Sequence, residues 1–295
     1  MRVNVLNRLK LFLKNNYALF KLVRLPGSLL GYYKSKAYAP LDVFWQNRID
    51  LVLQSPDNVL INRVAQAGSI DGDTQIMHNG IRINVGSYYG DGNTVLLHKN
   101  KGVHEPQEER AFQEILTSLP EDAIMLELGA FWAFYSITFL KYIKEGKSYL
   151  VEPDKHALVS GKNNFRLNGR KGSFHNYYIS EACEAGEVPT ITVTEFCKQQ
   201  KIIQLHILHS DIQGFELKML HGAKDLLLDG KISYLFISTH SNELHQHCKD
   251  FLREHNYDIL CEADLNQTYS WDGLIVAKHQ SETHGPTRLS ISHRL

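Results

Sequence analysis

The stretch that decides the fold is MLELGAFWAFYS at residues 125–136. It predicts a strand over 123–128, a turn with a single glycine, and a helix over 132–143. The same alternation of strand and helix continues along the chain. Further strands are expected at 148–152, 174–180, 203–210, 232–238, 257–262 and 273–279, and further helices at 155–167, 193–200, 215–228 and 242–255. This alternation predicts an α/β fold with a mostly parallel, seven-stranded sheet. The last two strands, which no helix separates, predict an antiparallel pair at one edge.

The pattern divides the chain into four segments. Residues 1–50 are expected to form a basic amphipathic helix and a connector, and residues 51–104 a small β-rich subdomain or lid. Residues 105–279 form the main domain, which a helix opens at 105–116, and residues 280–295 form a loose polar tail. The expected strands of the second segment are the β-prone runs at 58–64, 75–85 and 94–98.

Composition is that of an ordinary globular protein. The 295 residues are 43% hydrophobic and 22% charged, which excludes a disordered, collagen-like or disulfide-scaffold protein. A chain of this length buries enough apolar surface to fold without a disulfide or metal. Its four cysteines show no CxxC spacing, so we expect reduced thiols and a cytoplasmic protein rather than a zinc site.

The balanced total charge conceals an asymmetry. Residues 1–40 hold eight Lys and Arg and no acid, whereas the other 255 residues hold 24 basic and 32 acidic groups. Lysines interrupt the apolar positions of this N-terminal segment, so neither a membrane span nor a signal peptide is expected. Its helical face at residues 1–24 predicts peripheral membrane contact, or packing on the rest of the chain or on a partner subunit in a homo-oligomer. The acidic balance of the remainder disfavours nucleic acid as a partner.

The carboxyl ends of the expected strands carry the candidate site, since ligands of open α/β sheets bind there. Acids are found at the ends of four of these strands, and carboxylates accept hydrogen bonds from ribose hydroxyls and ammonium groups. The residues at these ends are Glu127, Gly129, Glu152, Ser180, Glu181, Asp211 and His240. A single glycine, with Phe131 and Trp132 beside it, does not suit a dinucleotide or phosphate cradle. A nucleoside cofactor without phosphates, S-adenosylmethionine, fits better; the alternative is a glycine that only packs the strand against its helix.

Three segments together resemble a known family. MLELGAFWAFYS (125–136), LVEPD (150–154) and HSDIQGFELKMLHGAKDLL (209–227) are similar, in order and spacing, to the FkbM-type S-adenosylmethionine-dependent methyltransferases. The resemblance covers roughly residues 105–278. It implies a Rossmann-like class I methyltransferase fold and an acceptor such as a sugar, a lipopolysaccharide-type glycan or a polyketide-like natural product.

The resemblance also implies roles for individual residues. Glu127 and Gly129 would face the methionine part of the cofactor, Glu152 the ribose hydroxyls, and Ser180 the adenine. Asp211 would lie at the methyl-transfer end. The other cofactor-binding candidates in these motifs are Ala130, Tyr135, Ser136 and Pro153. The chain departs from the family pattern at Phe131 and Ala133, where the family often has Asn and Gly, and this narrows the expected turn. It also has Gln213 in place of the acid before Gly214, whereas Glu216 is kept.

Methyl transfer to a hydroxyl needs a base or a metal at the same sheet edge. The catalytic candidates are Asp211, His209 and His240, and a divalent metal held by Asp211 and His240 is an open alternative. Each has a structural alternative: a helix cap for Asp211, a core histidine for His209, and a polar helix-start residue for His240.

A second polar group precedes the main domain and predicts a sugar-binding lid, although turns use the same residue types. Its members are Tyr88, Tyr89, Asp91, Asn93, His104 and Glu105. The leading hypothesis is an S-adenosylmethionine-dependent O-methyltransferase that acts on a hydroxyl of a glycan or small molecule. The alternatives are a nitrogen or macromolecular acceptor, and a degenerate binding or assembly module in which Phe131 blocks the cofactor.

Overall fold

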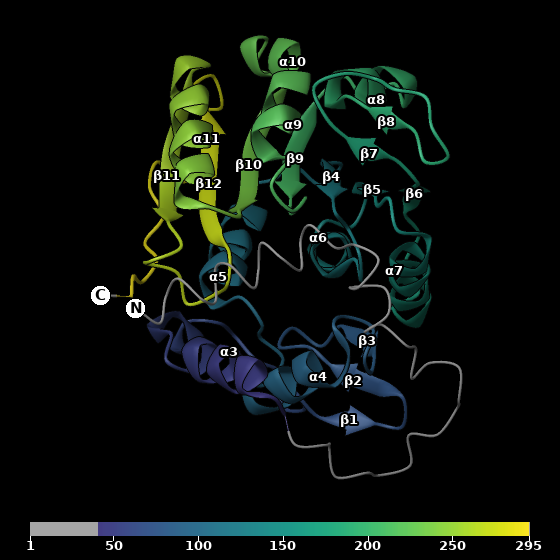
Figure 1. The fold of residues 1–295 in the computed structure, drawn as a ribbon, viewed down its shortest axis with the longest axis vertical. Helices are drawn as coiled ribbons and strands as arrows, with labels where there is room; N and C mark the ends of the chain where they lie inside the picture. The colour runs from purple at the N-terminus through teal and green to yellow at the C-terminus, as the bar shows by residue number, and fades with distance from the viewer. Residues whose placement is uncertain (1–40, 295) are drawn as a thin grey trace. The chain divides into compact units, whose positions relative to one another are not determined.

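The computed structural model describes residues 41–294, and a seven-stranded sheet lies at its centre (Figure 1). The strand order is β11-β12-β10-β9-β4-β5-β6. The parallel strands are β4 (Ile124–Leu128), β5 (Lys147–Val151), β6 (Ser173–His175), β9 (Leu205–Ser210) and β10 (Ile232–Thr239). Strand β12 (Gly273–His279) runs antiparallel to both β10 and β11 (Tyr257–Ala263). The predicted α/β class, with its antiparallel last pair, is confirmed.

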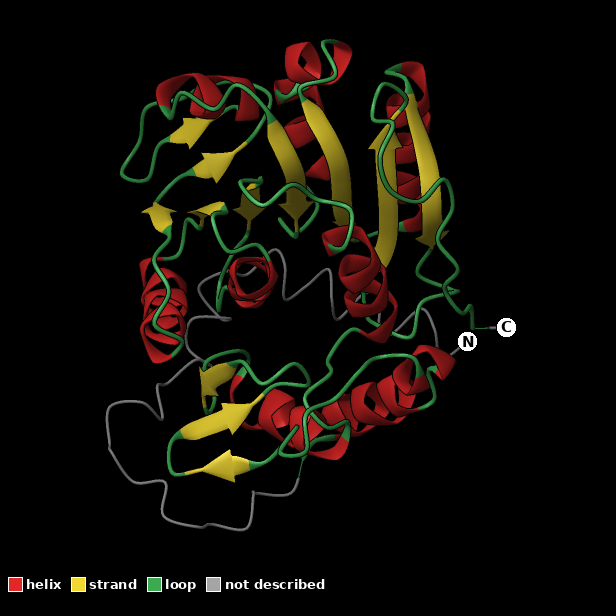
Figure 2. Ribbon diagram, turned by 180° about the vertical axis from the view of Figure 1, so that it is seen from behind, coloured by secondary structure: helices red, strands yellow, loops and turns green. Residues whose placement is uncertain are grey.

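Helices cover both faces of this sheet (Figure 2). Side chains of a strand alternate between its faces, so Met125 packs with one core cluster and Leu126 with the other. The first cluster includes residues of α5 (Pro106–Leu116), α6 (Phe134–Tyr142) and α7 (Lys155–Leu167). The second includes residues of α8 (Val193–Gln199), α9 (Glu216–Gly222), α10 (Lys224–Leu228) and α11 (Asn242–Glu254). Glu127 follows the alternation onto the α6 side, which decides what its carboxylate contacts.

Residues 42–104 mix helices with short strands. Strands β1 (Ile70–Asp71), β2 (Thr74–Ile76) and β3 (Arg82–Asn84) form an antiparallel sheet, as the run at 75–85 predicted. The strand prediction at 94–98 is wrong, because these residues belong to helix α4 (Gly90–Lys99). The run at 58–64 is not a strand either. Its first residues belong to the 3-10 helix η2 (Pro56–Val59), and the rest of the run is irregular. Residues 94–97 are all buried, so packing on several sides overrides the β propensity of Val95 and Thr94.

Three further elements differ from expectation. The predicted connector contains helix α3 (Val43–Leu53), whose cap Asp42 accepts a hydrogen bond from the backbone N–H of Trp45. The expected helix 215–228 is two helices that meet at Ala223. The expected strand 174–180 is interrupted, and its end, β7 (Tyr178–Ile179), pairs with β8 (Thr190–Ile191) in a separate small sheet. Asn176 lies at the interruption and donates to the carbonyl oxygens of Glu152 and Pro153, which ties it to the end of β5 instead.

The C-terminal tail packs on the domain, so the expectation that it is loose is wrong. Leu289 and Ile291 are buried, and the Leu289 N–H donates to the Leu260 carbonyl. The Ser292 N–H donates to the carboxylate of Asp57. Two apolar side chains spaced two residues apart place one face of an extended segment in the core.

The predictions for residues 1–24 lie outside the described residues. Within residues 41–294, no helix is long and apolar enough to cross a membrane. The boundaries of the four segments stay predictions.

Candidate functional site

The turn after β4 lies against the end of β9. Gly129 has a φ of +72°, and a Cβ on it would lie 1.9 Å from the carbonyl oxygen of Asp211. The Asp211 N–H also donates to the carbonyl of Leu128 at 3.0 Å. Phe131 and Ala133 take positive φ values of 36° and 64°, a conformation that glycine adopts more readily. The turn therefore keeps a left-handed path without the usual glycines, and its one glycine allows close approach to Asp211.

Glu152 ties this turn to the end of β5. Its Oε2 accepts from the Phe131 N–H at 3.1 Å, and its Oε1 accepts from the Asp154 N–H at 2.8 Å. Burial raises the pKa of Glu152 to about 7, although both N–H groups oppose the shift. Each carboxylate oxygen has a second lone pair, so Glu152 can accept further hydrogen bonds from a ligand diol. Pro153 offers the turn no side-chain donor, and its carbonyl accepts from Asn176.

Glu127 and its neighbours support the turn from behind. The Glu127 carboxylate accepts from the Ser136 N–H at 3.0 Å, and burial raises its pKa. The Ser136 hydroxyl accepts from Ser148, and Ser136 is fully buried. Buried Ala130 donates its N–H to the carbonyl of Val151. These residues hold the start of α6 against β4 and β5.

Two other predicted cofactor residues lie elsewhere. The Tyr135 hydroxyl donates to Glu105 at 3.1 Å, and its ring lies 4.2 Å from that of His209. The Ser180 carbonyl packs on α9, where a Cβ on Gly222 would lie 2.3 Å from it. In the described part of the chain, no hydrogen bond joins Ser180 to the turn after β4.

His240 lies at the end of β10 among three carboxylates. Its Nε2 is 3.3 Å from Asp211 Oδ1 and 3.5 Å from Asp272 Oδ1, and its Nδ1 is 2.9 Å from Glu216 Oε1. Burial lowers the pKa of His240, but the carboxylates of Asp272, Asp211 and Glu216 outweigh it and raise the pKa well above 6.5. The three carboxylates therefore favour the protonated form of His240, whose Nε2 lies within 3.5 Å of both Asp211 and Asp272.

Sequence reasoning missed Asp272. It precedes β12, and an antiparallel strand begins at the edge where its parallel neighbours end. The register pairs Gly273 with Thr239, so Asp272 lies opposite His240. The direction of an antiparallel last strand is therefore the sequence signal that could have located Asp272. Burial raises the pKa of Asp272 to about 6, with His240 opposing the shift.

The structure gives the metal hypothesis no support. Among residues 41–294, no group of three or more His, Cys, Asp or Glu side chains is arranged to hold a metal ion. Asp211 and His240 do lie together, with 3.3 Å between His240 Nε2 and Asp211 Oδ1.

His209 is a core residue. It is 3% exposed, and its Nε2 lies 2.7 Å from Glu108 Oε1 on α5. Its ring packs between Tyr135 and Phe236. Burial lowers the pKa of His209, and Glu108 raises it further than burial lowers it. These contacts favour a structural ion pair over a catalytic base.

The expected lid contacts the turn through aromatic rings. Tyr88 stacks on Trp132 with ring centres 4.5 Å apart and lies 5.1 Å from Phe131. His104 contacts both Glu105 and Glu109, and these carboxylates raise its pKa to about 10 against the effect of burial. Two members, Asp91 and Asn93, lie in helix α4. Tyr88 therefore packs on the turn after β4, where its ring contacts the side chains of Phe131 and Trp132.

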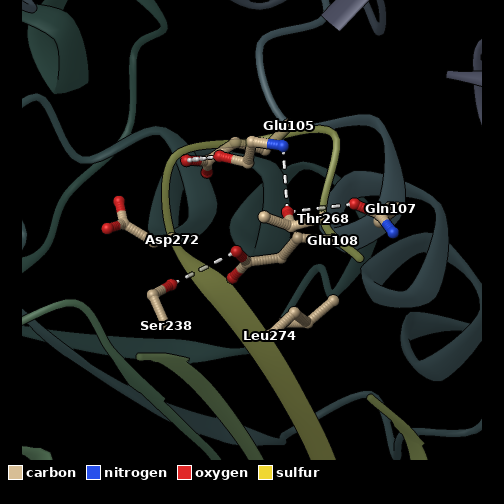
Figure 3. Close-up of a pocket in the computed structure, with 8 residues that line it drawn as sticks. Glu105, Gln107, Glu108, Ser238, Thr268, Asp272 and Leu274 are labelled. Carbon is tan, nitrogen blue, oxygen red and sulfur yellow. Dashed lines mark hydrogen bonds between the residues drawn. The ribbon is translucent and has the colours of Figure 1, made fainter. Parts of the chain in front are cut away.

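A small pocket opens beside His240, between the start of α5, the end of β10 and the segment before β12 (Figure 3). Three carboxylates and three hydroxyls line it, together with an amide and a leucine. The lining residues are Glu105, Gln107, Glu108, Ser238, Thr268, Ser270, Asp272 and Leu274. The candidate site therefore has two parts. One is the turn after β4, to which Glu152 is hydrogen-bonded, and the other is the polar pocket beside His240.

Part of the chain matches a known protein family. Residues 167–259 match the family model described as the methyltransferase FkbM domain. The matched segment includes Asp211 and His240 but not Gly129 or Glu152. No curated protein matches.

Three solved structures illustrate distant likenesses to the chain. A putative SAM-dependent methyltransferase from Streptococcus mutans has 12% identity and a TM-score of 0.45, over 71% of this chain and 56% of that one. Precorrin-6y C5,15-methyltransferase from Geobacter metallireducens has 14% identity and a TM-score of 0.42, over 59% and 89%. TrmK of M. capricolum, solved with S-adenosyl-homocysteine, has 15% identity and a TM-score of 0.41, over 58% and 68%. Likenesses at this level say nothing about the acceptor of this chain.

Proposed function

We propose that the chain is an S-adenosylmethionine-dependent methyltransferase of the FkbM type, whose family model matches residues 167–259, and that it methylates a hydroxyl group of a sugar, glycan or small natural product. The observation that carries the proposal is the placement of Glu152 and Asp211. They follow β5 and β9, on either side of the turn at Gly129 after β4. The acids therefore flank the turn at the sheet edge where α/β proteins bind ligands.

The residues present fit the cofactor by their chemistry. Glu152 has lone pairs for the ribose hydroxyls, and Asp211 supplies negative charge for the ammonium and sulfonium groups. The Asp211 side chain is 24% exposed, and this partial shielding from water strengthens its attraction to a cation. Glu127 would act through the start of α6, because its carboxylate already accepts the Ser136 N–H.

The bound cofactor supplies an activated methyl group, so the protein mainly has to orient the acceptor and take up its proton. The neighbouring carboxylates raise the pKa of His240 well above 6.5, and this disfavours His240 as the base that takes up that proton. We therefore assign His240 to positioning, since it holds Asp211 and Asp272 by its Nε2. His209 keeps a structural role in this scheme, because Glu108 holds its Nε2.

The other assignments also stay proposals. The acidic pocket beside His240 favours a polar hydroxylated acceptor over a phosphate-rich nucleic acid. A cytoplasmic location, with residues 1–24 in contact with a membrane surface or another subunit, is consistent with this chemistry. The edge-to-face contact of Tyr88 with Phe131 near the turn favours the competing binding-module hypothesis, because these rings restrict access to the turn.

Calorimetric titration with S-adenosylmethionine and S-adenosylhomocysteine tests the proposal. Wild-type protein should bind both, and Glu152→Gln should weaken binding at least about tenfold, since a hydrogen bond to a charged group contributes about 1.5–3 kcal/mol. Glu145→Gln is a matched control, because Glu145 is exposed just before β5 whereas Glu152 follows it. If the folded wild-type protein binds neither compound, the binding-module alternative replaces the proposal.

A further inference from the structure

We propose that the pocket between α5 and β12 receives the acceptor hydroxyl, and that Asp272 accepts its proton (Figure 3). This inference rests on the proposed function and adds the acceptor site and the base to it.

The pocket lies far enough from Glu152 to leave room for the cofactor between them. Ser238 belongs to β10 and Leu274 to β12, whereas Glu152 follows β5. Strand β10 is separated from β5 by β9 and β4, which at the usual strand spacing amounts to about 14 Å. Strands β4 and β9, with Gly129 and Asp211 at their ends, lie between the two and leave room for the methyl-bearing part of the cofactor.

Two of the three lining carboxylates are already engaged. Glu105 Oε1 lies 3.6 Å from Arg48 and accepts from Ser270, and its Oε2 lies 3.1 Å from His104 and accepts from Tyr135. The pKa of Glu105 is lowered to about 2, because these contacts outweigh its burial. Glu105 is therefore a weak base.

Glu108 is engaged in the same way. Its Oε1 lies 2.7 Å from His209, and its Oε2 accepts from Ser238 at 3.3 Å. Its side chain is 7% exposed, so a proton taken up there has no direct path to solvent. Glu108 holds Ser238 at the pocket wall.

Asp272 differs from both. Within residues 41–294 its ion pair is the 3.5 Å contact of Oδ1 with His240 Nε2, and its side chain is 25% exposed. Oδ2 can therefore receive a proton inside the pocket and release it to water. Arg48 fixes the segment that carries Asp272, because it donates to Ser270 at 2.7 Å and lies 4.7 Å from the ring of Trp271.

The size of the pocket limits what enters. Its free volume of about 10 Å³ holds one water-sized group. A hydroxyl at the tip of the acceptor fits, while the rest of the molecule stays outside. The hydroxyls of Ser238, Thr268 and Ser270 line the same space and offer polar contacts to it. The pocket therefore selects an unhindered alcohol, such as an exposed hydroxyl of a sugar.

The reaction balances with these groups. The O–H bond of the acceptor breaks and its proton passes to Asp272. The acceptor oxygen bonds to the methyl carbon, and the electron pair of the broken carbon–sulfur bond stays on sulfur. Protonated Asp272 then returns its proton to solvent.

Charged groups from four elements face Asp272. They are His240 after β10, Asp211 after β9, Glu105 before α5, and Arg48 of α3. With the pKa of Asp272 at about 6, the carboxylate form predominates at neutral pH, and turnover should fall as the pH is lowered through 6. A general base of this kind contributes about 10²–10⁴-fold to a rate.

Asp272→Asn, Asp272→Glu and the control Asp258→Asn test the proposal, since Asp258 is an exposed acid on β11. Release of S-adenosylhomocysteine is measured against a panel of methyl glycosides of hexoses, 6-deoxyhexoses and hexosamines. We expect Asp272→Asn to bind S-adenosylmethionine as wild type does, to lose at least a hundredfold in kcat, and to lose the acid limb near pH 6. Asp272→Glu should recover part of kcat with a shifted limb, and Asp258→Asn should behave as wild type.

Three results would overturn the inference. The first is a kcat of Asp272→Asn within twofold of wild type. The second is a loss confined to KM with an unchanged pH profile, which would make Asp272 a binding residue only. The third is a wild-type protein that binds S-adenosylmethionine but methylates no glycoside of the panel. A wild-type protein that does not bind the cofactor contradicts the proposed function itself, so the two failures are distinguishable.

Discussion

Gly129→Ala tests the contact on which the site depends. The added Cβ would lie 1.9 Å from the carbonyl oxygen of Asp211, which is backbone and cannot rotate away. The left-handed φ of +72° adds a conformational cost of about 1–2 kcal/mol. Overpacking adds about 1–3 kcal/mol, so the free energy of unfolding should fall by about 2–5 kcal/mol. The turn and Asp211 should also move apart, and cofactor affinity should fall with stability.

Gly72→Ala separates the two costs. Gly72 has a φ of +57° and nothing within 4 Å of its ideal Cβ, so only the conformational cost applies. Urea denaturation of wild type and both variants gives the three unfolding free energies, with equal slopes expected. The reasoning is refuted if Gly129→Ala is within about 0.5 kcal/mol of Gly72→Ala, a difference typical of a neutral substitution.

Three other predictions concern charge and packing. Because burial raises the pKa of Glu152 to about 7, affinity for S-adenosylhomocysteine should increase as the pH rises through 7, and calorimetry should find no such increase in Glu152→Gln. The pKa of His104 is raised from 6.5 to about 10, so its stabilising effect is complete below pH 6.5 and is lost as the pH rises toward 10. Unfolding free energies of His104→Gln measured over that range should lack this decline, and an unchanged slope would disprove the assignment. Leu289→Ala should lower the free energy of unfolding by about 2–5 kcal/mol, since Leu289 is buried against β11; a change below about 0.5 kcal/mol in urea denaturation would mean that the tail is not packed.

The fold of the main domain could be predicted because local patterns and packing agree there. Strands β4 and β10 are mostly apolar and almost entirely buried, and the side chain of Asp154 caps α7, which begins at Lys155. The segment before it could not be predicted in the same way. TVLLH is β-prone in isolation, but its burial within α4 decides its conformation. The packing of the C-terminal tail could not be predicted, because Leu289 and Ile291 are two apolar residues in an otherwise polar stretch.

The candidate site was only half visible in the sequence. Glu152 and Asp211 follow strands and could be found from the alternation alone. The protonation of His240 depends on three carboxylates from separate parts of the chain, a juxtaposition that only the folded chain reveals. Asp272 belongs to a turn-rich stretch, and its place follows from the antiparallel direction of β12.

A crystal structure of the chain with S-adenosylhomocysteine tests the central claim most directly. We predict ribose hydroxyls within hydrogen-bond distance of the Glu152 carboxylate, and a sulfur atom that faces the pocket of Asp272 across Asp211. Ligand bound away from the end of β5, or with its sulfur directed away from β10 and β12, would contradict the account.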